Sequence, residues 1–151
     1  MVAIDNILKP AIVRQNSNQL IVAKMRKVPL VKNGEPKFII RNKVKYTEMK
    51  IEINNISFIR ANNAGDRNTC FLWLNNNTEY CLQACISLIK LGKQHIDANL
   101  LRISKFEMVR IDRIESYVLH HTVMVDGRIL IMGRKFMKKI DALLLSIPRL
   151  N

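Results

Sequence analysis

The sequence predicts a mainly β fold of antiparallel strands with one or two short helices. Short runs of alternating or β-branched apolar residues recur through most of the chain. An Asp-Gly pair joins two such runs near the C-terminal end, and the runs do not alternate with helices as they do in parallel α/β sheets. Hydrophobic residues make up 48% of the chain, which is enough for a packed core.

Residues 1–36 are the least regular part of the chain. They contain short apolar runs, then Pro29 and a turn signal at Asn33-Gly34. This pattern fits either a hairpin packed on the body of the protein or a linker. We therefore expect an N-terminal appendage or linker over residues 1–36 and one domain over residues 37–151.

Strand patterns begin after residue 37. Residues 44–53 alternate between apolar and polar positions, and "ISFIRA" at 56–61 is a second run. The polar segment "NNAGDRN" at 62–68 then predicts a loop.

Two hairpins are expected further along the chain. The first joins "TCFLWL" to "TEYCL" through Asn75–Asn77, since Asn tolerates the positive φ of a tight turn. The second joins the halves of "HTVMVDGRILIM" through Asp126-Gly127, a pair that fits a type I′ turn.

Two segments have helical periodicity. Residues 84–93 carry apolar residues on one side, and Gly92 offers a C-terminal stop. Residues 134–148 end at Pro148 and place six apolar residues on one face: Phe136, Met137, Ile140, Leu143, Leu144 and Ile147. The opposite face carries four cations, Arg134, Lys135, Lys138 and Lys139. Because cations oppose the dipole at the start of a helix, we interpret them as a functional cluster suited to phosphate.

The charge of the chain predicts a polyanionic partner. It has 25 Lys and Arg residues against 12 Asp and Glu residues, for a net charge of +13. The excess is spread along the chain, so the folded body is itself basic. Nucleic acid or an anionic membrane surface is the natural partner class, and a basic surface that only keeps the protein in solution is the alternative.

Enzyme motifs are missing from the sequence. The five glycines are spaced too widely for a phosphate-binding loop, and no G-x-S-x-G sequence occurs. The carboxylates stand mostly among cations, where ion pairing explains them. We expect a protein that is not an enzyme and has no cofactor.

Cysteine and histidine usage argues against a metal site. Cys70, Cys81 and Cys85 form an odd set without a signal peptide, so we expect buried, reduced thiols in the cytoplasm rather than disulfides or zinc ligands. His120 and His121 would point to opposite faces of a strand, with one packed and one solvated. No run approaches about eighteen apolar residues, so we expect no membrane span, and we expect DNA and not a membrane as the partner.

The aromatic residues favour duplex DNA over a single strand. Proteins that bind unpaired bases stack them on exposed aromatic rings. Here aromatics are only 6% of the chain, and most, such as Trp73, lie inside apolar runs where core packing explains them. No pair of adjacent helices is visible for a helix-turn-helix motif either.

A known family resembles the chain over roughly residues 37–147. "LLRISKFEMVRIDRIES" at 100–116 places cations among large aliphatic residues, and "MVDGRILIMGRKFMKKIDALL" follows it. Together with "INNISFIRANN" and "LQACISLIKL" upstream, these segments resemble the LytTR family of bacterial DNA-binding domains in content and order. The resemblance implies an elongated arrangement of small antiparallel sheets whose loops enter successive major grooves.

The resemblance also implies a function and a site. The function is a sequence-specific transcription regulator, commonly the output half of a response regulator, which binds double-stranded DNA as two copies on tandem sites. Carried over by position, the DNA-facing residues form three patches: Asn62, Asn63, Arg67 and Asn68; Arg102, Ser104 and Lys105; and Arg134, Lys135, Lys138 and Lys139. Lys105 and Lys135 are expected at base edges, and the aliphatic residues of 97–116 are expected to pack the sheet.

Departures from the family pattern keep an alternative open. Ser104 stands where the family usually has His, and Glu107 and Arg110 replace an aromatic residue and Asn. These changes suggest a diverged protein-interaction module that kept the scaffold and binds DNA weakly without regard to sequence.

Overall fold

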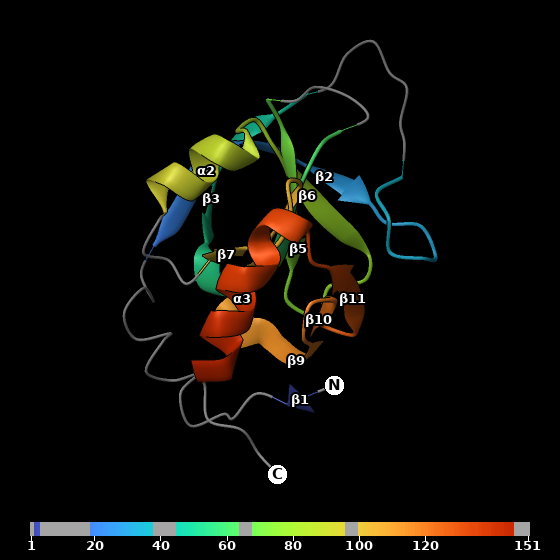
Figure 1. Ribbon diagram of the computed structural model, residues 1–151. Helices are drawn as coiled ribbons and strands as arrows, with labels where there is room; N and C mark the ends of the chain where they lie inside the picture. The colour runs from blue at the N-terminus through green and yellow to red at the C-terminus, as the bar shows by residue number, and fades with distance from the viewer. Residues whose placement is uncertain (1, 4–18, 38–44, 64–67, 96–99, 147–151) are drawn as a thin grey trace.

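The computed structural model describes residues 2–3, 19–37, 45–63, 68–95 and 100–146, and it has the expected mainly β fold (Figure 1). Every strand pair in this part of the chain is antiparallel. The described strands form two sheets, and two short α-helices pack against them. None of the described helices has both the length and the apolar character needed to cross a membrane.

The larger sheet has seven strands. They are β2 (Leu20–Pro29), β3 (Thr47–Glu52), β4 (Ile56–Ala61), β5 (Cys70–Leu74), β6 (Tyr80–Ala84), β7 (Leu100–Arg102) and β8 (Glu107–Arg110). Their order in the sheet is β3-β2-β6-β5-β4-β8-β7. Since β4 is buried on both faces, the middle of this sheet belongs to the core on both sides.

The smaller sheet has the order β1-β9-β10-β11. Its strands are β1 (Val2–Ala3), β9 (Ile114–Val118), β10 (Thr122–Val125) and β11 (Arg128–Ile131). The predicted Asp-Gly hairpin is confirmed, since Val125 pairs with Arg128 and both Asp126 (φ 48°) and Gly127 (φ 77°) have positive φ.

Residues 20–29 lie inside the larger sheet. Strand β2 pairs with β3 on one side and with β6 on the other, where Met25 is opposite Ala84. Ile21, Met25 and Val28 are buried. The boundary expected at residue 36 therefore does not separate this strand from the rest of the sheet.

The helices are α2 (Leu88–Gln94) and α3 (Arg134–Ser146). Helix α2 begins later than predicted because the Ser87 hydroxyl caps it by accepting a hydrogen bond from Lys90 N. It also continues through Gly92, which lies against Met108 where a Cβ would be only 3.0 Å from the methyl carbon. Helix α3 confirms the predicted amphipathic segment up to its last described residue, and Ile147 and Pro148 lie outside the described residues.

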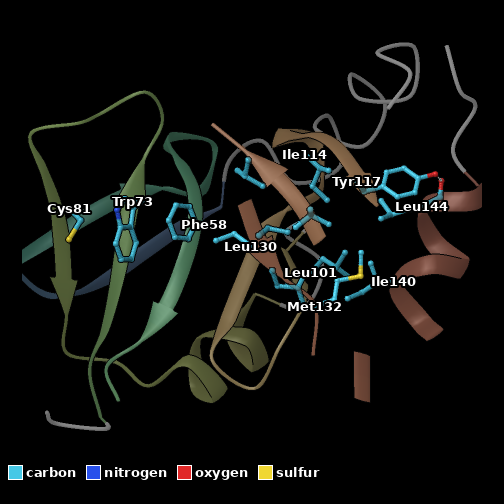
Figure 2. Close-up of a cluster of buried hydrophobic side chains, with 14 of the residues drawn as sticks. Phe58, Trp73, Cys81, Leu101, Ile114, Tyr117, Leu130, Met132, Ile140 and Leu144 are labelled. Carbon is cyan, nitrogen blue, oxygen red and sulfur yellow. Dashed lines mark hydrogen bonds between the residues drawn. The ribbon is translucent and has the colours of Figure 1, made fainter. Parts of the chain in front are cut away.

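Two hydrophobic clusters hold these layers together. One lies between the larger sheet, the smaller sheet and α3; Figure 2 shows it extending from Trp73 and Phe58 to Tyr117, Ile140 and Leu144. The other lies on the opposite face of the larger sheet, where side chains of β3 take part in it and α2 packs against it. Cluster packing on both faces fixes the ends of β4, β7 and β8, where the candidate site lies.

Two sequence expectations for this region were wrong. Phe106, expected to pack the sheet, is 42% exposed. His120 and His121 are both exposed because they lie in the turn after β9, where His120 has a positive φ of 59° and pairs with Asp141 of α3.

Arg110 is buried and holds two parts of the larger sheet together. Its guanidinium pairs with Asp112 and donates to the carbonyl oxygens of Ile53, Asn54 and Ile56. Those carbonyls belong to the short 3-10 helix Ile53–Asn55 and to the strand that follows it. This cation is therefore structural and is not available to an external ligand.

Candidate nucleic-acid interface

The turn between β7 and β8 is held by its own hydrogen bonds. Arg102 donates from Nε to the carbonyl oxygen of Ser104 (3.0 Å) and from Nη2 to that of Lys105 (2.6 Å). The Ser104 hydroxyl accepts from Phe106 N at 3.2 Å, and Ile103 N donates to the Glu107 carbonyl at 3.1 Å. These bonds leave Lys105 and Phe106 at the most exposed point of the turn, which we call the tip.

The tip carries one cation and one aromatic ring side by side. Both side chains are exposed, and Lys105 Nζ lies 5.6 Å from the centroid of the Phe106 ring. Arg102, predicted as a DNA contact, is only partly exposed, and its guanidinium is occupied by the turn and by the Phe136 ring at 5.7 Å. It is therefore a positioning residue for Lys105.

The end of β4 lies beside the tip. Ala61 N donates to the Phe106 carbonyl at 2.8 Å, so the next residues, Asn62 and Asn63, start next to the tip. The Asn62 amide nitrogen donates to the Thr69 hydroxyl at 3.1 Å, which closes the base of the 62–68 loop. Asn63 and Asn68 are exposed, while Arg67 lies outside the described residues.

The start of α3 lies on the other side of the tip. Gly133 N donates to the Ile103 carbonyl at 2.7 Å, and a Cβ on Gly133 would lie 3.2 Å from Ser104 Cα. The exposed Arg134 and Lys135 follow directly. Lys138 and Lys139 are also exposed, one turn further along the helix.

A hollow of about 390 Å³ connects the first two patches. It lies between the end of β4, the tip and the start of α2. Its walls are both polar and apolar: Ala61, Asn62, Asn63, Ser87, Leu88, Ile89, Arg102, Lys105 and Phe106. The tip thus lies between the hollow and the start of α3, and we call the described residues of the three patches the strip.

The exposed cations of the strip have no ion-pair partner in the part of the chain that the structure describes, whereas arginines elsewhere in the fold do. Arg60 pairs with Glu35 and Glu107, and Arg113 pairs with Asp126 at 2.5 Å. Within the described ranges, no carboxylate lies within ion-pair distance of the tip or α3 cations: Lys105, Arg134, Lys135, Lys138 and Lys139. Their charge is available to an external anion.

The cysteines do not form a reactive or metal-binding centre in the described part of the chain. Burial raises the pKa of the Cys70 and Cys81 thiols to about 12, which keeps them protonated. Cys85 is exposed, in contrast to the expected burial of all three thiols. No group of three metal-binding side chains occurs among the residues that the structure describes.

The sequence interpretation missed the apolar side chains beside this strip. Phe106 and Ile89, 42% and 58% exposed, both line the hollow. The available signal was the polar neighbourhood of Phe106, because Ser104, Lys105 and Glu107 are typical of a turn and not of a buried strand. Ile89 lies off the buried face of α2, which Leu88 and Leu91 occupy.

No protein-family model matches the chain, and no curated protein matches it.

Proposed function

We propose that the chain is a sequence-specific transcription regulator that binds duplex DNA in the manner of LytTR domains. The observation that supports this most directly is the strip, in which part of the first patch and the start of the third lie beside the tip. The cations of the strip have no acidic partner among the described residues, so phosphate would supply the missing counter-charge.

The residues of the three patches make two kinds of contact, with phosphates and with base edges. Asn63, Arg134, Lys138 and Lys139 contact phosphates and set the register of the protein on the duplex. Lys105 enters the major groove at the tip, and Lys135 reaches a second base edge from the start of α3. Both ammonium groups suit the paired acceptors of guanine.

Three of the departures from the family pattern, at Glu107, Arg110 and Gly133, have structural explanations that leave the exposed cations of the strip in place. Glu107 pairs with Arg60 at 3.2 Å, and Arg110 is buried with Asp112, so neither residue faces outward. Gly133 stands where the family usually has Ser and allows close approach to Ser104. These replacements lie beside or beneath the tip, and Lys105 remains exposed on it.

Two copies on tandem sites are part of the same proposal. A single copy would cover one short stretch of major groove through the tip and one further contact through α3. When two copies that contact each other bind one duplex, the first holds the second near its site, and this raises the overall affinity.

The test is selection of bound fragments from random duplexes at moderate salt, followed by affinity measurements over a range of salt concentrations. We expect a recurring sequence and an affinity that falls with salt, with a slope of several units in a plot of log K against log[salt]. Unrelated fragments recovered with a slope near zero would contradict the proposal.

A protein-interaction module is the second candidate. The observation that favours it is the edge strand β11, where Ile129 and Ile131 are 61% and 67% exposed. An edge of this kind can pair with a strand of another protein. A pull-down with immobilised chain, compared with an Ile129→Lys/Ile131→Lys variant, separates the two functions because only this candidate requires the edge.

A further inference from the structure

Phe106 exposes an aromatic ring at a place where the backbone cannot move to hide it. Its N–H is bonded to the Ser104 hydroxyl and its carbonyl to Ala61 N, so the residue is fixed from both sides. Large aromatic side chains contribute most when they are removed from water. An exposed ring on a fixed turn therefore indicates a contact that forms only when a ligand binds.

The surroundings of the ring define the chemistry of that ligand. Ile89 and Leu88 of α2 form an apolar side of the hollow, while Asn63 and Lys105 supply polar groups at its rim. The ligand must therefore present a small apolar group directly beside hydrogen-bonding atoms. In the major groove of DNA, only the C5-methyl group of thymine meets that description, because the other exposed edges are polar.

The position of Lys105 argues against stacking of an unpaired base. Its ammonium group lies over the Phe106 ring, 5.6 Å from the centroid, and occupies a face that a stacked base would need. The edge of the ring and the neighbouring Ile89 remain available for a methyl group.

We propose that Phe106, with Ile89, is a specificity-determining contact that selects thymine next to the base pair read by Lys105. This inference rests on the proposed function, since it names a base that the same interface prefers. The methyl group would enter the hollow between the tip and α2 and displace water from the Phe106 ring.

The test uses a duplex recovered by selection and a series of copies in which each thymine in turn is replaced by deoxyuridine. This replacement removes the methyl group and keeps every hydrogen-bonding atom of the base pair. For the full chain we expect about a threefold to tenfold loss of affinity at one position, as for a single buried apolar carbon. In Phe106→Ala the loss at that position disappears, whereas Val22→Ala, at an exposed position of β2 that does not line the hollow, retains it.

The outcomes separate this inference from the function it depends on. If the chain binds a selected duplex but tolerates deoxyuridine everywhere, the thymine contact is wrong and DNA binding stands. A loss of equal size in the full chain and in Phe106→Ala also overturns the contact, because the methyl group is then read elsewhere. Failure to recover any preferred duplex contradicts the proposed function and the contact with it. Thermal unfolding of Phe106→Ala confirms that the variant is folded.

Discussion

Arg102 donates a hydrogen bond from Nη2 to the carbonyl oxygen of Lys105 at 2.6 Å, so one cation of the predicted site holds the other in place. The same guanidinium bonds to the Ser104 carbonyl and lies against Phe136. Arg102, predicted from the sequence as a DNA contact, thus also holds the backbone of the tip.

Replacement of the two residues separates these roles. Lys105→Gln should lower discrimination at one base position by about 1–3 kcal/mol and leave thermal stability unchanged. Arg102→Gln loosens the turn, so it should weaken discrimination at every position read by the tip and lower the free energy of unfolding by about 1–2 kcal/mol. Affinities for a panel of singly substituted duplexes, with thermal unfolding of each variant, check both expectations. Equal stability of the two variants would count against the positioning role.

The buried ion pair of Arg110 and Asp112 predicts a large effect on stability. Arg110→Met leaves the buried carboxylate of Asp112 without its partner and removes donors from three carbonyl oxygens. We expect a loss of about 3–5 kcal/mol in the free energy of unfolding, measured with urea. The double variant with Asp112→Leu should recover part of this loss, whereas Lys90→Ala on the exposed face of α2 serves as the control with little effect.

The close approach of Gly133 to Ser104 predicts that α3 is sensitive to one added methyl group. The Cβ of Gly133→Ala would lie 3.2 Å from Ser104 Cα and 3.3 Å from a ring carbon of Phe136. Because the contact is with backbone, the tip or the start of α3 must give by a few tenths of an ångström, and we expect weaker DNA binding together with a loss of about 1–3 kcal/mol in stability. Unchanged affinity in a destabilised variant would show that the spacing between α3 and the tip does not matter for binding.

The raised pKa values of Cys70 and Cys81 predict a stability that falls in alkaline solution. Below about pH 9 both the folded and the unfolded chain keep these two protons, so pH has no effect through them. Above it the unfolded chain releases them and the folded chain retains them up to about pH 12, which favours unfolding as pH rises. Over this range the two thiols together lower the free energy of unfolding by about 2–3 kcal/mol for each unit by which the pH rises.

Urea unfolding of the wild type and of Cys70→Ala/Cys81→Ala from pH 8 to 10.5 measures this contribution as the difference between their slopes. A thiol reagent at pH 8 gives an independent check. We expect it to modify the exposed Cys85 rapidly and the two buried thiols only after unfolding. Rapid modification of all three would contradict the burial.

Local patterns in the sequence predicted the elements whose geometry is set within a few residues. The Asp126-Gly127 turn needs only its two positive φ angles, and the apolar stripe of α3 needs only its period. The position of β2 could not be predicted in this way, because its partners are residues 47–52 and 80–84. Sheet order depends on long-range pairing that alternation does not encode.

In the candidate site too, features set by nearby residues could be predicted from the sequence, and features set by distant residues could not. Exposed cations on a turn and on one helix face are readable from their spacing, and Lys105 and the α3 cluster are exposed as expected. The burial of Arg110 is not readable, because three of its hydrogen-bond acceptors lie more than fifty residues away. The exposure of Phe106 was missed because large aliphatic residues on both sides of the turn suggested one packed segment, although its immediate neighbours Lys105 and Glu107 are polar.

The salt dependence of duplex binding, measured on four single variants, tests the central claim that the strip is the DNA-binding surface. Arg134→Ala and Lys138→Ala remove one charge each from the phosphate-contacting part of the strip; Lys32→Ala and Lys50→Ala remove one charge each from exposed positions on the β2–β3 connection and on β3. We predict that each strip variant reduces the slope of log K against log[salt] by about one unit, while each control leaves it unchanged. Equal reductions in all four variants would contradict the account, because binding would then follow the total charge of the chain and not the strip.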